Sequence, residues 1–322
     1  MDEKKMMIAQ EELKAKLQEI AVQGPNGNSF ELARLANSPI DAELPFPEVI
    51  AEICKTARVE KGEDYEYFTL SPETKTVTTI TSGSITQTNV TPDSENDLTF
   101  ASYSSLAYNV YVEKLLEAKY DPIAIKAKVA MRSLDYKETK DVLDLAIAAA
   151  VSQSNTFVND SGDSKIDFEK LVEIVEALIK YGDKVVMVAG STVYRDIILL
   201  DYNDNKEREV SALKAGITKV IPVRTYTYTH STTQTILADD KAVFVATVDA
   251  ADERPIHFVR RKVSDLTGNG GTKERIVVAS GPRIQVGSSP KWAYEIAAME
   301  QYGAVVVNEY ACAVYQDAAV YA

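Results

Sequence analysis

The longest uninterrupted helical pattern in the chain runs over residues 122–150. Asp121 can cap a helix, and Pro122 suits the first turn, where a missing N–H costs nothing. Neither Gly nor Pro interrupts the run, so the pattern predicts a helix about 43 Å long at about 1.5 Å per residue. Globular helices average only about 11–12 residues. We therefore expect the rest of the chain to be arranged around this helix.

The apolar positions of this helix fall on two nearly opposite stripes at roughly 100° per residue. The first stripe contains Ile123, Ala127, Ala130, Leu134, Leu145 and Ala149, and the second contains Ile125, Val129, Tyr136, Leu143, Ile147 and Ala150. Charged side chains form a strip between the two, made of Lys126, Lys137, Lys140 and Asp144. The pattern predicts a spine helix that is packed from both sides and has one solvated edge.

Residues 1–57 are short helical pieces separated by Pro and Gly, and no piece could bury a core alone. One piece begins at Pro47 and reads PEVIAEICKTA. Residues 58–112 are β-prone and rich in Thr and Tyr, with segments reading YEYFTL, TVTTIT, SITQTNV and LTFASYSSLAYNVYV. An isolated hairpin with few aliphatic residues is marginal in water. We expect this hairpin to pack on a neighbour, either elsewhere in the chain or in another subunit.

Beyond the spine, residues 155–164 are polar and predict a loop. An amphipathic helix should follow the capping residue Asp167 and end at Gly182. Its apolar positions are Phe168, Leu171, Val172, Val175, Leu178 and Ile179. A buried strand over 185–188 and a helix capped by Ser191, TVYRDIILLDY, come next.

From residue 217 onward the pattern predicts strands separated by Asp-rich and Gly-rich turns. They read TKVIPV, RTYTYT, AVFVATV, IHFVRRKV, ERIVVAS, WAYEIAAMEQYG, AVVV and EYACAVY. Helices and strands mix without a strict βαβ alternation, so the pattern indicates the α+β class.

Composition narrows the class of protein further. The length of 322 residues fits two domains or one large one, and 45% hydrophobic with 26% charged residues is typical of soluble globular proteins. No apolar run approaches the ~20 residues of a membrane span. The net charge of −13 argues against a dedicated nucleic-acid-binding surface. Cys54 and Cys312 lie far apart in the sequence and indicate buried free thiols in place of a disulfide framework.

Candidate chemistry is sparse. The two histidines, His230 in a Thr-rich loop and His257 in a predicted strand, have no Cys, Asp or His at metal-ligand spacing, which favours structural roles. Residues 190–192 read GST, which lacks the nucleophile-elbow pattern and fits a helix cap. The GNGG at 268–271, followed by Lys273, matches neither phosphate-binding fingerprint. We therefore predict no catalytic, cofactor-binding or metal-binding residues.

Two further patterns are rejected on their chemistry. The acidic turn that begins at Asp201 starts like a calcium loop, but Lys206 stands where the loop requires Gly and Ala212 stands where it requires Glu. Asn89 and Asn159 match the glycosylation pattern, but the charged N-terminus does not look like a secretory signal.

The order of elements resembles the major capsid protein of tailed bacteriophages, the Hong Kong 97-type fold. The resemblance rests on an arm, a long hairpin, the segment VEKLLE at 112–117, the spine, the stretch KVVMVAGSTVYRDI and the late strand WAYEIAAMEQYGAVVV. It implies an N-terminal arm at 1–57, an extended loop at 58–111, and a peripheral domain with the spine at 112–182. An axial domain at 183–255 and C-terminal strands at 256–322 would complete both domains.

The resemblance also implies a function. The chain would be a structural protein, not an enzyme, that self-assembles as hexamers and pentamers into an icosahedral phage head enclosing double-stranded DNA. Its partners would be further copies of itself and separate scaffolding and portal proteins, and a decoration protein could also bind. The DNA would be enclosed without sequence-specific binding, no membrane would be involved, and the protein would reside in the virion after assembly in the host cytoplasm. Some relatives crosslink a Lys to an Asn, but no motif around Lys75 carries that feature over.

Two alternatives stay open at this point. An encapsulin-like nanocompartment shell would have the same fold but would hold enzymes in place of DNA. A soluble α+β hydrolase or sugar-binding protein would belong to a different class, and the scarcity of His, Cys and motifs weighs against it.

Overall fold

A computed structural model describes residues 46–68, 95–117, 122–158, 166, 168–204, 215–223, 226–227, 233–248, 254–264, 272–285 and 291–317. Its helices are α3 (Glu48–Ile53), α4 (Val112–Glu117), α5 (Pro122–Ser152), α6 (Phe168–Leu178), α7 (Ser191–Asp204) and the 3-10 turn η4 (Glu309–Ala311). Its first strands are β1 (Cys54–Val59), β2 (Glu66–Phe68), β3 (Glu95–Asp97), β4 (Ala101–Ser104), β5 (Tyr108–Tyr111), β6 (Thr156–Val158), β7 (Lys184–Ala189) and β8 (Ile217–Pro222). The remaining strands are β9 (Tyr226–Thr227), β10 (Thr233–Gln234), β11 (Lys241–Thr247), β12 (Ile256–Arg261), β13 (Val263–Ser264), β14 (Thr272–Lys273), β15 (Arg275–Gln285), β16 (Lys291–Val306) and β17 (Cys312–Gln316).

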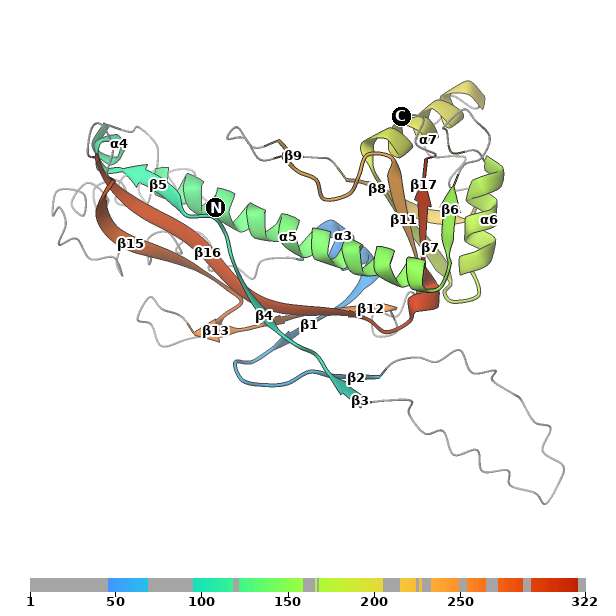
Figure 1. The fold of residues 1–322 in the computed structure, drawn as a ribbon, viewed down its shortest axis with the longest axis horizontal. Helices are drawn as coiled ribbons and strands as arrows, with labels where there is room; N and C mark the ends of the chain where they lie inside the picture. Colours follow the sequence, from blue (N-terminus) through green and yellow to red (C-terminus); the bar gives the residue numbers. More distant parts are fainter. Residues whose placement is uncertain are drawn as a thin grey trace, which may run out of the picture.

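The first sheet is built around β16, which is 16 residues long. Strands β12 and β15 pair with one edge of β16, and β4 and β5 pair with its other edge, all four in antiparallel orientation. Strand β1 extends the sheet in parallel beyond β12. In Figure 1, α5 lies above the long β15–β16 ribbon, and the β2–β3 pair lies below it. One strand therefore gathers segments from both halves of the chain under the spine.

The second sheet stands at the C-terminal end of α5, in the order β6-β17-β11-β7-β8 (Figure 1). Its central strands are apolar at successive positions because both faces are covered. Val186 and Val188 of β7 face the core shared with α5 and α3, whereas Val185 and Met187 face the core shared with α6 and α7. This two-sided burial explains the continuous apolar run from which the strand was predicted.

The predicted spine helix is confirmed as α5, which spans Pro122–Ser152 and would be about 46 Å long. The prediction that both apolar stripes are buried is wrong for most of the second stripe and for Leu145 of the first stripe, which is only partly buried. Ile125 is 47% exposed, and Val129, Tyr136 and Ile147 are only partly buried, so Leu143 and Ala150 alone are buried from the second stripe.

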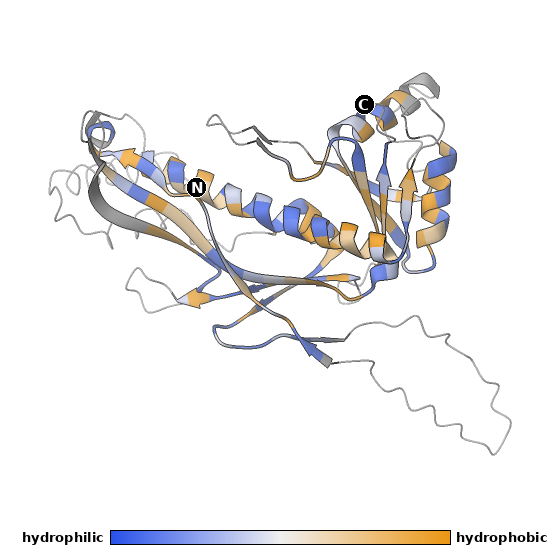
Figure 2. Cartoon of the chain, in the orientation of Figure 1, coloured by the Kyte–Doolittle hydropathy of each residue, from blue (hydrophilic) through white to orange (hydrophobic). Residues whose placement is uncertain are grey.

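The buried face of α5 instead rotates along the helix. At about 100° per residue, Ile123, Ala127, Ala130, Met131 and Leu134 cover about 100° of arc facing β16 and β5. In the C-terminal half the buried arc widens and turns by roughly 100°, because the helix there lies between the two sheets. Figure 2 shows hydrophilic residues along the middle of α5 and hydrophobic ones at the end that meets the second sheet.

Several predicted element boundaries need correction. The helix that begins after Pro47 ends at Ile53, because Cys54–Val59 pairs with β12 as β1. The predicted polar loop at 155–164 contains strand β6, which pairs in parallel with β17. Gly303 does not separate two strands, because β16 runs through it without a break. Helix α6 ends at Leu178, before the predicted stop at Gly182.

Other predictions fall outside the described residues. They are the short helical pieces before residue 46, the strands TVTTIT and SITQTNV, the turn at 71–75, His230, the acidic turn after residue 204 and the GNGG at 268–271. The division of the chain into five segments stays a prediction.

The backbone groups in the first turn of α7 form hydrogen bonds with other backbone groups. The Gly190 carbonyl accepts the first helical hydrogen bond, from Tyr194 N at 2.9 Å, so Gly190 and not Ser191 occupies the capping position. The N–H groups of Thr192 and Val193 donate to the Asp239 carbonyl at 3.0 and 3.3 Å. A Cβ added at Gly190 would lie 2.3 Å from the Ala238 carbonyl oxygen. The position therefore requires glycine because another backbone segment approaches it.

We expect Gly190→Ala to lower the free energy of unfolding by about 1–3 kcal/mol, because the clashing atom is backbone and cannot rotate away. Ser191→Ala is the matched control, since Ser191 is exposed and its side chain adds no atom to this contact. Urea unfolding followed by circular dichroism would measure both. Equal midpoints for the two variants would contradict the proposed close packing.

The base of the predicted hairpin is anchored to the first sheet. Strands β2 and β3 pair in antiparallel register, with Glu66 opposite Asp97. The Arg261 guanidinium lies 3.9 Å from the centroid of the Phe100 ring and donates to Asp64 Oδ1 at 3.1 Å. The Tyr65 hydroxyl lies 3.4 Å from His257 Nδ1. These contacts hold the root of the hairpin against β12.

Candidate functional site

The predicted chemistry-bearing residues do not converge on one place. Burial, together with the positive charge of Lys55, lowers the pKa of His257 to about 4. Cys54 and Cys312 are free, buried thiols, and burial raises the pKa of both, that of Cys312 to about 12. A thiol held protonated is a poor nucleophile. Within the described ranges, no three His, Cys, Asp or Glu side chains are grouped so as to hold a metal ion.

The charged side chains gather where α5 crosses the first sheet. We call this group the spine junction, and it comprises Arg58, Asp135, Glu138, Arg260, Glu274, Arg275 and Glu300. At its centre Arg260 of β12 forms a two-point ion pair with Glu138 of α5, with both N–O distances at 2.7 Å. Both side chains are 0% exposed. A fully buried guanidinium–carboxylate pair therefore ties the helix to the middle of the sheet.

Arg275 of β15 is the second centre of the spine junction. Its Nη1 donates to Asp135 Oδ1 at 2.5 Å, and its Nε donates to Glu300 Oε2. Its Nη2 lies 2.9 Å from Glu138 Oε2 but outside hydrogen-bond geometry. Because Arg275 faces carboxylates from both α5 and β16, it links three elements at once.

The outer side of the spine junction connects it to the start of the described chain. Glu274 lies 3.4 Å from Arg260 Nη1 and 2.5 Å from Arg58 Nε, so it joins β12 to β1. The Phe46 ring covers Arg260, with its centroid 4.3 Å from the guanidinium carbon. Residues from five segments thus meet at one buried charged cluster.

Burial has a large electrostatic consequence for Glu300. Desolvation, reinforced by the nearby Glu138 carboxylate, raises the pKa of Glu300 to about 8 against the opposing pull of Arg275 and Arg260. Desolvation likewise raises the pKa of Asp135, which Arg275 partly offsets. The pKa of Arg275 is raised because its three carboxylate neighbours outweigh its own desolvation.

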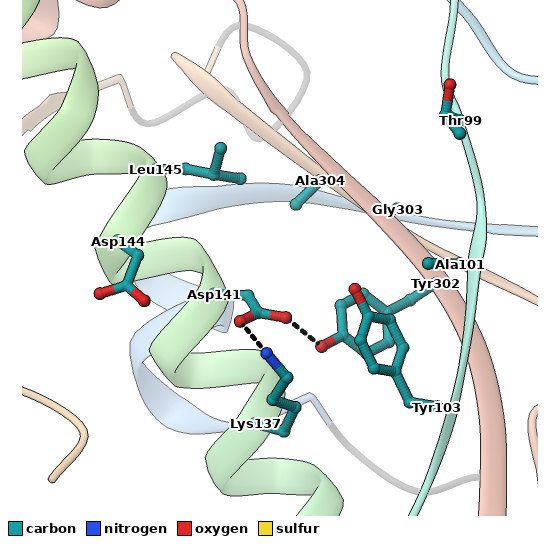
Figure 3. A pocket seen from close by; sticks show the side chains of 10 residues that line it. All are labelled: Thr99, Ala101, Tyr103, Lys137, Asp141, Asp144, Leu145, Tyr302, Gly303 and Ala304. Carbon is teal, nitrogen blue, oxygen red and sulfur yellow. Dashed lines mark hydrogen bonds and ion pairs between the residues drawn. The ribbon is translucent and has the colours of Figure 1, made fainter.

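Beside the spine junction lies a pocket of about 430 Å³ between α5, β16 and the segment that leads into β4 (Figure 3). The Tyr302 hydroxyl donates to Asp141 Oδ2 at 2.7 Å, and Lys137 Nζ lies 2.5 Å from Asp141 Oδ1. The Tyr103 and Tyr302 rings stack with their centroids 4.2 Å apart. Burial, with the neighbouring Asp141 carboxylate, raises the pKa of Tyr302. Three of the polar side chains that line the pocket, those of Lys137, Asp141 and Tyr302, are thus paired with one another.

This arrangement suits attachment better than catalysis. A catalytic acid or base must be able to reach a substrate, but Glu138 and Arg260 are fully buried and satisfy each other. A buried pair costs desolvation energy and gives little net stability, yet removal of one partner is strongly destabilising. The spine junction therefore specifies where α5 lies on the sheet.

The spine junction was not predicted from the sequence, although one signal was present. Glu138 lies about 40° around the helix from Leu134, on the buried face, so it is a charge at an apolar position. Arg260 is likewise fully buried on β12, next to the buried residues Phe258 and Val259. Charges at buried positions of two different elements indicate a buried pair, but the periodicity alone does not show which charges meet.

No protein-family model and no curated protein sequence matches this chain. Solved structures do match. The structure titled Microbacterium phage Oxtober96 covers 86% of this chain and 92% of its own, with 13% identity and a TM-score of 0.54. The structure titled Mycobacterium phage Cain covers 88% and 94%, with 13% identity and a TM-score of 0.50. A virus-like particle from Pyrococcus furiosus matches more loosely, with 13% identity over 89% of this chain and 99% of its own and a TM-score of 0.49.

The likenesses to the two phage structures, with TM-scores of 0.54 and 0.50, establish the fold. The chain has the α+β Hong Kong 97-type phage capsid fold, as the order of its sequence elements predicted. At 13% identity the likeness shows the fold alone.

Proposed function

We propose that this chain, with its Hong Kong 97-type fold, is a structural subunit of a closed protein shell. Many copies would assemble as hexamers and pentamers into an icosahedral phage head that encloses double-stranded DNA. The observation that carries the proposal is the match to a phage structure at a TM-score of 0.54 over 86% of this chain. The match covers 92% of the other chain as well, so it extends over most of both chains.

Exposed apolar side chains support assembly. Large hydrophobic residues are exposed at several places on the described chain, namely Leu106, Ile125, Val151, Val158, Phe168, Ile179 and Leu199. Single exposed apolar residues are common on monomers. Here Ile125 and Val151 lie near opposite ends of the spine, so contacts with further copies would cover the helix along its length.

The absence of an accessible catalytic arrangement among the described residues agrees with a structural role. The most perturbed carboxylate, Glu300, is 1% exposed and contacts an arginine. We propose that the protein is not an enzyme. Among the described helices, none is both long enough and apolar enough to cross a membrane.

The proposal extends to partners and location. The principal partner would be the chain itself. Separate scaffolding and portal proteins, and a decoration protein, would be further partners. A net charge of −13 would repel DNA phosphates, which suits a wall that encloses DNA without sequence-specific binding. The protein would reside in the virion after assembly in the host cytoplasm.

Sedimentation and negative-stain microscopy of the purified chain would test the proposal. We expect rings of five or six subunits and closed shells. Nucleic acid inside shells isolated from producing cells would favour a phage head, whereas enclosed enzymes would favour a nanocompartment. Only monomers at every salt concentration, with or without a scaffolding protein, would overturn the proposed function.

A second experiment separates assembly from folding. Residues 69–94 are replaced by Asn-Gly, a two-residue turn that can close the β2–β3 pair between Phe68 and Glu95. The Asp64–Arg261 and Tyr65–His257 contacts stay in place, so the body should fold with a similar unfolding midpoint. If the hairpin lies on a neighbouring subunit, every interface loses contacts at once, and closed shells should not form.

The wild-type chain, taken through the same unfolding and sedimentation measurements, is the control for this replacement. Intact shells from the shortened chain would show that the hairpin is not an assembly element. Loss of folding would show that residues 69–94 belong to the chain's own core.

A further inference from the structure

The charges of the spine junction do not balance. Three guanidinium groups, those of Arg58, Arg260 and Arg275, face four carboxyl groups, those of Asp135, Glu138, Glu274 and Glu300. If every group were ionised, this set of described residues would carry one excess negative charge. Because an uncompensated buried charge is very costly, the excess charge is relieved either by water around an exposed carboxylate or by a proton on a buried one.

Glu300 is the carboxyl group least equipped to remain charged. It is 1% exposed, whereas the Asp135 side chain is 36% exposed and can be solvated. Its Oε2 accepts from Arg275 Nε, but its Oε1 is buried and has no hydrogen-bond partner in the described part of the chain. By contrast, both oxygens of Glu138 accept from Arg260. A carboxylate normally accepts several hydrogen bonds, so a buried oxygen without a donor favours the neutral acid.

We propose that the spine junction is a proton-binding site, in which Glu300 holds a proton in the folded chain near neutral pH and releases it in mildly alkaline solution. With that proton bound, three positive charges face three negative charges. When the proton leaves, a second carboxylate stands beside that of Glu138, and the attachment of α5 to the sheet weakens. This site does not depend on the proposed shell function.

The neighbours of Glu300 on every packed element agree with this assignment. Helix α5 presents Glu138, which repels a second negative charge, and Asp135, which is paired with Arg275; β15 and β12 present Arg275 and Arg260, which attract a negative charge. Strand β4 places Tyr103 opposite Glu300 in register, and β16 itself supplies Tyr302, which is bound to Asp141. Burial and Glu138 outweigh the arginines, so the pKa of Glu300 is raised to about 8.

The raised pKa makes the stability depend on pH with a definite sign. A carboxyl group with a pKa of 4.5 in the unfolded chain and about 8 in the folded chain stabilises the fold fully below pH 4.5. That contribution is lost as the pH rises through 8. His257 acts in the opposite direction, because its lowered pKa of about 4 makes stability rise between pH 4 and 6.5. In the window from pH 6.5 to 8 the effect of Glu300 therefore outweighs the small remaining effect of His257.

Urea unfolding of the full chain at pH 6.5 and pH 8 tests the proposal. The unfolding equilibrium constant of the wild type should rise roughly tenfold from pH 6.5 to pH 8. The reason is that Glu300 holds about one proton in the folded chain at pH 6.5 and releases it when the chain unfolds. Glu300→Gln mimics the neutral acid and should show almost no change. Glu295→Gln, a half-buried residue of the same strand, is the matched control and should follow the wild type. Equal pH dependence in wild type and Glu300→Gln would overturn the proposal.

Infrared spectroscopy supplies a measurement that does not depend on the variant's stability. At pH 6.5 the wild type should show the carbonyl band of a buried protonated carboxyl group, and this band should disappear above pH 8. A spectrum with only carboxylate bands at pH 6.5 would overturn the proposal, whatever the unfolding curves show.

Discussion

Replacing Leu134 or Leu143 with Asp is expected to abolish soluble folding of the chain. The two side chains lie on opposite sides of α5, are 2% and 0% exposed, and belong to different core clusters. Each substitution places a carboxyl group among apolar side chains with no partner. The cost should be at least about 4 kcal/mol, against a typical total stability of about 5–15 kcal/mol.

Lys140→Glu is the control for these two substitutions. Lys140 lies on the solvated edge of α5, where it pairs with Asp144 at 2.5 Å and both side chains are about half exposed. Loss of such an exposed pair should cost about 1 kcal/mol or less. Thermal unfolding would compare the three variants. An unchanged melting temperature for either Asp variant would contradict the rotating buried face of α5.

Arg260→Met should cause the next largest loss of stability, about 3–5 kcal/mol, because it leaves the Glu138 carboxylate buried without its main partner. The double variant Arg260→Met, Glu138→Leu removes both charges and should recover much of that loss. Urea unfolding of the single and double variants would measure the difference. A double variant less stable than the single variant would show that Glu138 is held mainly by Arg275, not by Arg260.

The elements predicted best from the sequence are those whose local signals agree. The sequence of the spine offers a candidate cap, Pro in the first turn and no breaker, and α5 begins at Pro122 as expected. Strands β7 and β11 have continuous apolar runs because both faces of the second sheet are covered. In these cases local propensity and tertiary burial favour the same structure.

The elements that were missed depend on partners distant in sequence. Strand β6 has three residues within a polar stretch, and it is a strand because β17 lies beside it. Gly303 looked like a boundary, but pairing with Val259 of β12 keeps β16 continuous. The rotation of the buried face of α5 depends on the second sheet meeting only its C-terminal half. The spacing of apolar residues along the helix does not show which part of it meets the second sheet.

The spine junction shows a different limit of sequence analysis. Glu138 was visible as a charge on a buried face, but its partners come from β12 and β15, more than a hundred residues later in the chain. The protonation state of Glu300 depends on its burial and on the charges of Glu138, Arg260 and Arg275, which lie on three other elements. Such a property emerges only when the fold has brought those charges together.

The central place of β16 has a consequence for synthesis and folding. Its pairing partners in β4 and β5 precede it by 182 residues at Ala293–Tyr111 and by 201 residues at Tyr302–Ala101. At about 5–20 residues per second, a ribosome needs about 10–40 seconds to make that interval. Contacts so distant in sequence form slowly, because closing a long loop comes before any gain from pairing. Until residues 291–306 emerge, the apolar face of α5 lacks the strand that covers it, and nascent chains are then most exposed to aggregation and to chaperone binding.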